Sequence, residues 1–182
     1  MTEVEIRAKI DNVEEIKKKL EELGAKFFKF EKQVDRVFGH SMFMDDDNML
    51  IEGGLSARIR EVDNKKALEF KEIVRQGAGI EISSELDDVE TGLKFFEKLK
   101  FKEAFTVSKS RESYSYKDFT ICLDKVDQLG NFIEVEKMIT FSNDKESARK
   151  ECLDLLNILS PNSEVEHRKY GDLMQEIINK NK

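Results

Sequence analysis

The sequence has few of the residues on which several common active sites depend. It contains two cysteines and two histidines in 182 residues. Cys122 and Cys152 lie far apart without a CxxC pair, so we expect neither a zinc site nor a disulfide framework, and both should be small core residues. The two histidines, His40 and His167, are too few to make a Ser or Cys triad or a histidine metal site a good explanation. The chemistry must therefore come from carboxylates, lysines and arginines.

Long apolar runs are also missing. No run approaches the length of a membrane span, and the charged N-terminus has no signal-peptide hydrophobic region, so we expect a cytoplasmic protein without membrane contact. The net charge of -7 argues against an extended nucleic-acid surface but is compatible with a local basic cavity. Charged residues make up 38% of the chain, well above the roughly 25% of an average globular protein. This excess needs an explanation.

The chain repeats a strand and helix pattern. Residues 79–99 align without gaps with residues 3–23, so that Glu81 aligns with Glu5 and Leu99 with Leu23. A third, similar segment begins at Phe132. With a single proline and a length that can bury one core, these repeats predict one domain spanning residues 1–182.

The first ten residues give the clearest strand signal, because apolar residues alternate with Glu3, Glu5, Arg7 and Lys9. Asp11 or Asn12 then caps a helix that Gly24 ends, and a second strand is expected near residues 25–38. Short turns join the later elements, which predicts an α+β fold with a hairpin-rich antiparallel sheet. Further strands are expected near 55–62, 67–74, 101–109, 112–116 and 120–126, a helix from about 143 to 159, and a long loop at 39–54.

Charge is collected on one face of these strands. Arg58 and Arg60 share a face, as do Glu69 with Lys71, Lys109 with Arg111, and Glu134 with Glu136. The polar face of any one strand could simply meet water. Paired charges of one sign on six strands instead suggest a polar lumen, provided that the sheet closes with its helices outside.

The charges fall into two sets that together suit a polyphosphate. Carboxylates are hard ligands for Mg²⁺ or Mn²⁺, while guanidinium and ammonium groups bind phosphate oxygens. The candidate metal ligands are Glu3, Glu5, Asp124, Glu134 and Glu136. The candidate phosphate-binding residues are Arg7, Lys9, Arg58, Arg60, Lys71, Lys109 and Arg111. We expect Glu3, Glu5, Arg58, Arg60, Lys71, Lys109, Arg111, Asp124, Glu134 and Glu136 to share one cavity.

The ordered motifs resemble the CYTH superfamily, or triphosphate tunnel metalloenzymes, over nearly the whole chain. Glu3-Val-Glu5-Ile-Arg7 is similar to the opening ExExK motif, Ala57-Arg58-Ile59-Arg60 to the RxR strand, and Leu68-Glu69-Phe70-Lys71 to the lysine strand. Lys109-Ser-Arg111 resembles the KxR element, and Asp124 with residues 129–136 resembles the late metal-binding strands. Gln33-Val-Asp35 followed by Phe38, and the HRKYGDLM segment from His167, resemble the class IV adenylyl cyclase branch.

The resemblance implies an eight-stranded antiparallel barrel or tunnel with helices packed outside. It implies Mg²⁺ or Mn²⁺ at the carboxylates named above and a triphosphate at the basic residues, with catalytic roles for Glu3, Glu5, Lys71, Glu134 and Glu136. Two departures stand out: Arg7 replaces the motif's lysine and stays protonated, and residues 39–54 lack the cyclase branch's usual Pro-Arg-Asp-Phe-like segment.

Three functions remain open. The cyclase-like reaction converts ATP to cyclic AMP and pyrophosphate; a triphosphatase would hydrolyse tripolyphosphate, thiamine triphosphate or a nucleoside triphosphate; a third reading is a non-catalytic polyphosphate or nucleotide-binding protein. A homodimer is possible.

Asp45, Asp46 and Asp47 lack EF-hand spacing and should form a solvated loop, whereas Phe95, Phe96, Leu99 and Phe101 should be core residues.

Overall fold

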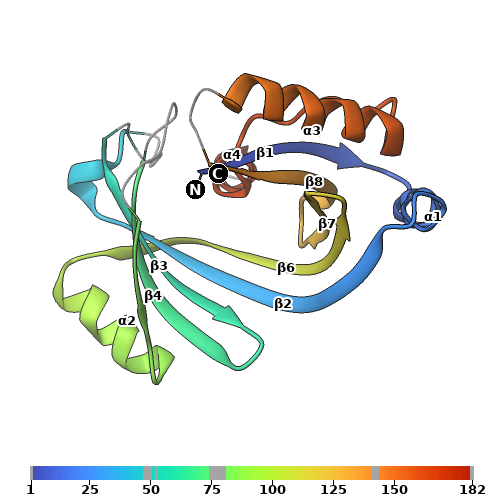
Figure 1. Cartoon of the computed structure of the whole chain (residues 1–182). Coiled ribbons are helices and arrows are strands. Elements are labelled where there is room, and N and C mark those ends of the chain that lie inside the picture. The colour runs from blue at the N-terminus through green and yellow to red at the C-terminus, as the bar shows by residue number, and fades with distance from the viewer. Residues whose placement is uncertain (1, 47–50, 52, 74–80, 141–143, 181–182) are drawn as a thin grey trace. The chain divides into compact units, whose positions relative to one another are not determined.

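The computed structural model describes residues 2–46, 51, 53–73, 81–140 and 144–180 (Figure 1). These residues form eight strands, four α-helices and one short 3₁₀-helix, which confirms the predicted α+β class. The strands are β1 (Thr2–Ile10), β2 (Lys26–Gly39), β3 (Leu55–Val62), β4 (Lys65–Glu72), β5 (Glu81–Glu85), β6 (Lys102–Tyr116), β7 (Phe119–Val126) and β8 (Gly130–Ile139). The helices are α1 (Val13–Glu22), η1 (Ser41–Phe43), α2 (Val89–Lys98), α3 (Lys145–Leu159) and α4 (Tyr170–Lys180).

The strands form one eight-stranded sheet in the order β1-β8-β7-β6-β2-β3-β4-β5. Every pairing with a defined register is antiparallel, as predicted. Among the described residues no pairing joins β1 to β5, the two end strands of this order. Closure of the sheet into a barrel or tunnel therefore stays a prediction.

The chain divides into two compact units, which we describe separately. Unit 1 comprises Met1–Glu31 and Lys109–His167, and unit 2 comprises Lys32–Ser108 and Arg168–Lys182. The strands β2 and β6 each contribute to both units. The prediction of a single domain over residues 1–182 stays a prediction.

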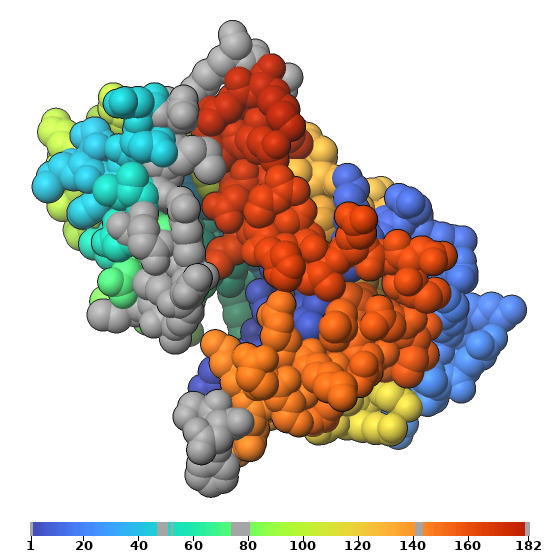
Figure 2. All heavy atoms as spheres, turned by 90° about the horizontal axis from the view of Figure 1, so that it is seen from above, coloured from blue at the N-terminus to red at the C-terminus, as the bar shows by residue number. Residues whose placement is uncertain are grey.

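The core of unit 1 lies between the sheet and two helices. Strand residues on one face of β1, β7 and β8 are buried against α1 and α3, because alternate positions of these strands are apolar. The helix α3 runs along β1 and β8 in Figure 1, and in Figure 2 its side chains lie in front of β1. The cluster consists of Ile6, Ala8, Ile10, Ile16, Leu20, Ile121, Leu123, Ile133, Val135, Cys152, Leu155, Leu156 and Leu159. The intervening residues of each strand must therefore point to the opposite face.

Helix boundaries follow the predicted capping signals. The side chain of Asn12 accepts a hydrogen bond of 3.1 Å from the backbone N–H of Glu15, and Gly24 adopts a φ of 76° just after α1. The second repeat begins its helix in the same way, because the side chain of Asp88 accepts a hydrogen bond of 2.8 Å from the backbone N–H of Thr91. The helix α2 also has the same ten-residue length as α1. The first residues of that repeat, 79 and 80, lie outside the described residues.

In unit 2 the helix α2 packs on one face of β3 and β4. Phe96 is fully buried against Phe38, Ala57 and Ile59. Gly92 allows this close approach, because an added Cβ would lie 3.0 Å from the Cδ1 atom of Ile59. Arg58 and Arg60 alternate with the buried residues of β3 and so lie on the face away from α2.

Several element predictions need correction. The two strands expected at 101–109 and 112–116 are one continuous strand, β6. The 39–54 loop contains η1, and the sequence analysis did not predict α4. Residue 74 of an expected strand, the start of the third expected helix near 143, and Asp47 of the acidic loop lie outside the described residues. Asp45 and Asp46 are exposed, as predicted.

Two predicted core residues are exposed. Phe95 and Leu99 have relative exposures of 53% and 45%, whereas Phe96 has 0%. The helix α2 buries one narrow face, so the adjacent Phe95 points elsewhere, and Leu99 is the C-cap residue that follows the helix. Cys122 and Cys152 are buried free thiols, which confirms their predicted place in the interior. None of the described helices is both long enough and apolar enough to cross a membrane.

Candidate functional site

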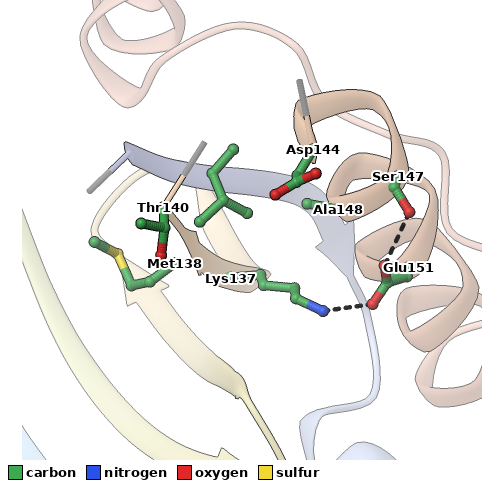
Figure 3. A pocket seen from close by; sticks show the side chains of 8 residues that line it. Lys137, Met138, Thr140, Asp144, Ser147, Ala148 and Glu151 are labelled. Carbon is green, nitrogen blue, oxygen red and sulfur yellow. Dashed lines mark hydrogen bonds and ion pairs between the residues drawn. The ribbon is translucent and has the colours of Figure 1, made fainter. Parts of the chain in front are cut away.

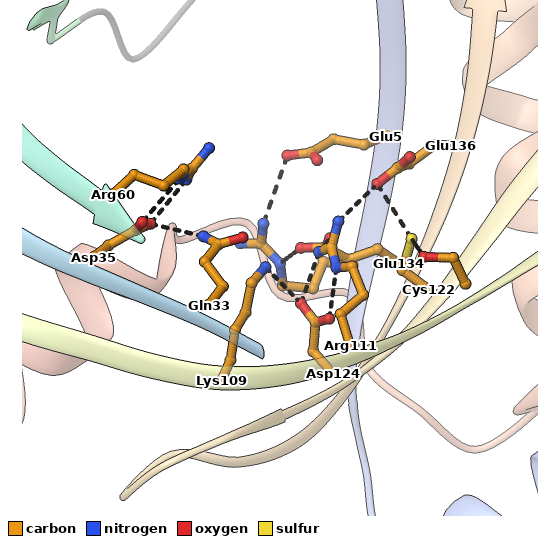
Figure 4. Close-up of polar contacts among 12 residues, drawn as sticks. Glu5, Gln33, Asp35, Arg60, Lys109, Arg111, Cys122, Asp124, Glu134 and Glu136 are labelled. Carbon is orange, nitrogen blue, oxygen red and sulfur yellow. Dashed lines mark hydrogen bonds and ion pairs between the residues drawn. The ribbon is translucent and has the colours of Figure 1, made fainter. Parts of the chain in front are cut away.

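The face of unit 1 opposite its helices carries a cluster of charged side chains from four neighbouring strands. The register places Glu5 opposite Glu136, Arg7 opposite Glu134, and Cys122 opposite Glu134. Directly opposed residues of adjacent strands share a face, so charges far apart in the sequence become neighbours. Figure 4 shows dashed contacts that join Arg111 to Asp124 and to Glu136 in this cluster.

Arg111 is the centre of this cluster. Its guanidinium forms a bidentate pair with Asp124, with Nε–Oδ1 at 2.6 Å and Nη2–Oδ2 at 2.7 Å. It also donates to Glu134 and lies 3.5 Å from Glu136. Burial alone would lower the pKa of Arg111, but the hydrogen bonds that it donates to Asp124 and the negative charges around it raise that pKa, so the guanidinium stays charged.

The two most buried carboxylates are each paired with two cations. The Asp124 side chain is 0% exposed and also accepts a 2.9 Å bond from Nζ of Lys109. Glu134 is 3% exposed and accepts a 2.5 Å bond from Nε of Arg7. Burial would raise the pKa of Asp124, but Arg111 and Lys109 outweigh it and hold that pKa below its usual value. Asp124 and Glu134 thus hold the basic side chains in fixed positions.

Three other carboxylates approach one another with less compensation, since Glu5 lies 3.6 Å from Arg7 and Glu136 lies 3.5 Å from Arg111. Oxygens of Glu3, Glu5 and Glu136 all lie within 4.8 Å of each other. Desolvation raises the pKa of Glu136 to about 7, and the negative charges of Glu3, Glu134 and Glu5 add to this despite Arg111. Desolvation and the charge of Glu134 also raise the pKa of Glu5. Three hard oxygen ligands that repel each other suit a divalent cation, so these residues fit Mg²⁺ or Mn²⁺.

The raised pKa of Glu136 predicts that metal-free protein loses stability as pH rises. Its carboxyl ionises near pH 7 in the fold but near 4.5 when unperturbed, so folding is increasingly opposed between these values. The loss amounts to at most roughly 3 kcal/mol, at 1.36 kcal/mol per pKa unit. Denaturant unfolding with a chelator at pH 5 and pH 8 should show it in the wild type and much less in Glu136→Gln, where the raised pKa of Glu5 remains. Equal pH dependence in both proteins would contradict the assignment.

A buried thiol adjoins these carboxylates. The Cys122 Sγ lies 3.7 Å from Oε1 of Glu136 and 3.7 Å from Oγ of Ser113. Burial raises the pKa of Cys122 to about 12, so the thiol is neutral and acts as a weak donor to Glu136. The sequence analysis missed this contact, although Cys122 lies two residues before Asp124 on β7 and therefore on the same face of the strand.

Unit 2 has its own charged cluster on β2, β3, β4 and β5. Arg60 forms a bidentate pair with Asp35, with both N–O distances at 2.8 Å, and Gln33 donates a further 2.8 Å bond to the same carboxylate. Burial would raise the pKa of Asp35, but the hydrogen bonds and charge of Arg60, together with Arg58, hold it below its usual value. The sequence analysis had placed Gln33 and Asp35 in a branch motif but not in the site.

Arg58 and Lys71 complete this second cluster. Arg58 donates to Glu69, which is 7% exposed, and to Glu81 at 3.0 Å. Lys71 donates to the other oxygen of Glu81 at 3.1 Å. Glu69 and Glu81 were not among the predicted site residues. Two features of the sequence could have identified them. Glu69 lies on the same strand face as Lys71, and Glu81 aligns with Glu5 in the repeat.

The structure thus gathers the predicted residues into two groups. Unit 1 joins Glu3, Glu5, Arg7, Lys109, Arg111, Asp124, Glu134 and Glu136. Unit 2 joins Arg58, Arg60 and Lys71. Lys9 is exposed near the end of β1. The prediction that ten of these side chains share one cavity depends on how the units are placed and stays a prediction.

A pocket elsewhere in unit 1 has a different character. It has a volume of about 310 Å³ and lies between the end of β8 and the start of α3, on the helix-covered side of the sheet (Figure 3). Its only lysine, Lys137, is held 2.7 Å from Asp118 and 2.5 Å from Glu151. The charged face of unit 1 brings together Arg7, Lys109 and Arg111, whereas this pocket is lined by one cation, so the pocket is the poorer anion site.

An antiparallel sheet that presents fixed arginines beside a carboxylate trio has the residue types expected of a class of protein that binds phosphate-rich ligands together with divalent cations. The comparison with known families agrees with this class. Residues 1–170 match the CYTH domain, and the chain belongs to the CYTH family. The family resemblance drawn from the motifs is therefore confirmed.

Named relatives cover most of the chain. A protein of Methanocaldococcus jannaschii, "Putative adenylate cyclase MJ0240", is 33% identical over 167 residues, which cover 88% of this chain and 90% of the relative. The structure of the PH1012 protein from Pyrococcus horikoshii OT3 is 29% identical, with a TM-score of 0.74 and coverage of 95% and 99% of the two chains. The Hippeastrum "Putative adenylyl cyclase HpAC1" shares the fold at 16% identity, with a TM-score of 0.70 and 96% coverage of each chain.

Proposed function

We propose that this protein is a divalent-metal-dependent enzyme that converts ATP to cyclic AMP and pyrophosphate in the manner of class IV adenylyl cyclases. The observation that carries the proposal is the carboxylate trio of Glu3, Glu5 and Glu136 beside the guanidinium groups of Arg7 and Arg111. Anionic ligands for a cation and cationic ligands for phosphate thus occur on one face of one unit. The name of the Methanocaldococcus jannaschii relative supports the cyclase reaction.

Each group of side chains has a separate task in this proposal. Glu3, Glu5 and Glu136 would hold Mg²⁺ or Mn²⁺, which when bound supplies Lewis acidity toward phosphate oxygens and the attacking hydroxyl. Asp124 and Glu134 would add ligands as their basic partners turn toward the phosphates. Arg7, Lys9, Lys109 and Arg111, with Arg58, Arg60 and Lys71, would bind the triphosphate oxygens and neutralise their charge.

In the cyclase reaction the ribose 3′-hydroxyl of ATP attacks the α-phosphorus and pyrophosphate leaves. The chain's basic residues would orient the phosphates and stabilise the charge that develops on the leaving pyrophosphate. Arg7 fixes a positive charge where the family motif has lysine and cannot accept a proton from the nucleophile. We assign Lys71 to the catalytic set with Glu3, Glu5, Glu134 and Glu136; its ammonium group donates to Glu81 at 3.1 Å.

A triphosphatase is the second candidate. The Hippeastrum protein was described as revealing a dominant triphosphatase activity, and the same residues would serve a water that attacks the terminal phosphorus. Fixed arginines and hard carboxylates do not by themselves select one nucleophile. A non-catalytic polyphosphate-binding protein is disfavoured, because anion capture alone does not need the Glu3, Glu5 and Glu136 trio.

One assay separates these functions. We expect incubation with ATP and Mg²⁺ or Mn²⁺ to give cyclic AMP and pyrophosphate in equal amounts. Parallel reactions with thiamine triphosphate and inorganic tripolyphosphate measure the competing hydrolysis, with phosphate scored separately. Phosphate without cyclic AMP would select the triphosphatase, and tight binding without turnover of any substrate would select the binding protein.

A further inference from the structure

The carboxylate of Asp35 in unit 2 is buried and hydrogen-bonded on both oxygens. Asp35 lies directly opposite Arg60 in the register of β2 and β3. Its Oδ1 accepts a 2.8 Å bond from Nε of Arg60, and its Oδ2 accepts 2.8 Å bonds from Nη2 of Arg60 and from Nε2 of Gln33 (Figure 4). Breaking a buried pair with this geometry is costly, so an incoming anion does not readily displace Asp35.

Gln33 supports this pair from the same strand. It lies two residues before Asp35 on β2, so both side chains share one face, and it is also buried. Its amide donates to the Oδ2 atom that also accepts from Arg60. The amide is uncharged, so it restricts the orientation of the carboxylate without competing with Arg60 as a second cation would.

The Asp35 pair occupies one edge of the Arg60 guanidinium. A guanidinium carries five N–H donors in a planar fork, and Asp35 takes the edge of Nε and Nη2. The third nitrogen, Nη1, lies 3.9 Å from Glu69, which is too long for a hydrogen bond. Arg60 can therefore exchange this longer contact for a phosphate oxygen while it keeps both bonds to Asp35.

We propose that Asp35 and Gln33 are positioning residues that hold Arg60 in the orientation that binds a triphosphate, and that the Asp35–Arg60 pair stays intact in the bound state. The assignment rests on the proposed function and adds two residues to its site. Asp124 and Glu134 of unit 1 differ from Asp35, because they are assigned to bind the metal as their basic partners turn toward the phosphates.

The sign of the effect separates positioning from simple electrostatics. A negative charge beside a polyanion opposes its binding, so by charge alone the removal of Asp35 would increase triphosphate affinity. A carboxylate that fixes a guanidinium favours binding, because the ordering of Arg60 is then complete before the ligand arrives. The two roles thus predict opposite changes for one substitution.

Asp35→Asn tests this sign. Its single side-chain oxygen cannot accept from both Nε and Nη2, and its NH₂ group opposes an N–H donor, so Arg60 loses its fixed orientation. Calorimetry with metal present would compare ATP and inorganic tripolyphosphate on the wild type and the variant. We expect both affinities to fall about tenfold or more, in the range for a lost charge-assisted contact. An unchanged or higher affinity would overturn the positioning role.

Glu103→Gln is the matched control. Glu103 accepts from Nε and Nη2 of Arg36 at 3.3 and 2.5 Å, which is the same bidentate pairing outside both charged clusters. Its substitution removes one negative charge and one arginine partner, as Asp35→Asn does. We expect both affinities to stay within about twofold of the wild type, since no residue of the charged clusters changes its partner.

Gln33→Met is a milder variant that keeps the length of the side chain and the net charge but removes the amide donor. We expect the affinities for ATP and tripolyphosphate to fall about threefold to tenfold, the equivalent of one neutral hydrogen bond. This variant decides the matter if Asp35→Asn does not fold. Affinities equal to those of the wild type would remove Gln33 from the positioning set, and with it the proposed support of Asp35.

A double-mutant cycle with Arg60→Ala distinguishes positioning from a general structural role. If Asp35 acts through Arg60, Asp35→Asn should change the tripolyphosphate affinity by no more than about twofold once Arg60 is alanine. A structural role would lower the affinity by the same factor in both backgrounds, and that result would overturn the proposal.

The wild-type measurement keeps the two proposals distinguishable. If the wild type binds neither ATP nor tripolyphosphate with metal present, the proposed function and the positioning role fail together. If the wild type binds both ligands and Asp35→Asn binds them equally well, the positioning role alone is overturned and triphosphate binding stands.

Discussion

Replacing Glu5 and Glu136 together by glutamine should abolish metal-dependent turnover while increasing the stability of the metal-free protein. Both carboxyls have raised pKa values because they are desolvated beside other negative groups. Neutral amides remove this repulsion, and they also remove two of the three oxygens that lie within 4.8 Å of each other. Loss of a metal that contributes several kcal/mol to the transition state predicts a fall in turnover of about 10³-fold or more.

Glu134→Gln is a comparison for the stability effect alone, because Glu134 is also assigned to the metal ligands. Glu134 is nearly fully buried and pairs with Arg7 and Arg111, so its neutralisation leaves buried cations undercompensated. We expect a loss of stability of about 3 to 5 kcal/mol, opposite in sign to the effect at Glu5 and Glu136. Activity assays at saturating Mn²⁺ and denaturant unfolding with a chelator measure both effects. Unchanged metal dependence in the Glu5 and Glu136 double variant would remove these residues from the metal site.

The different expectations for Glu134 and Glu136 show where sequence reasoning ends. Alternation along β8 placed both glutamates on one face, and the structure agrees. Their partners depend on register, because Glu134 meets Arg7 and Glu136 meets Glu5 across β1. A strand pattern of period two is the same for several registers, so it predicts the face of a residue but not its cross-strand neighbour.

The same limit explains the residues that the sequence analysis missed in unit 2. Basic residues were assigned to phosphate binding from their parity, but the carboxylates that hold them in place were not identified. Asp35 meets Arg60, and Glu69 meets Arg58, only through the pairing of β3 with its two neighbours. The exposed Phe95 reflects a second limit, since a run of apolar residues on a short helix does not show how wide its buried face is.

Removing single basic residues should weaken triphosphate binding more than monophosphate binding. Arg58, Arg60, Lys109 and Arg111 are already charged, desolvated and fixed by carboxylates, so they can exchange a carboxylate oxygen for a phosphate oxygen with little new ordering. Each alanine substitution should reduce ATP binding by about 1.5 to 3 kcal/mol, the range for a hydrogen bond to a charged group. AMP, with fewer phosphate oxygens to engage, should lose less.

Arg111 should show the largest effect of the four, because it contacts Asp124, Glu134 and Glu136 at once. Arg111→Lys keeps the charge but not the bidentate fork, so it should restore only part of the ATP affinity that Arg111→Ala loses. Arg36→Ala is the matched control, since Arg36 also pairs with a carboxylate, Glu103, but lies outside both clusters. Calorimetry against ATP, ADP and AMP with metal present measures the differences. Equal affinities of the wild type for all three nucleotides, or an Arg36→Ala loss as large as that of Arg111→Ala, would show that these arginines do not form a triphosphate site.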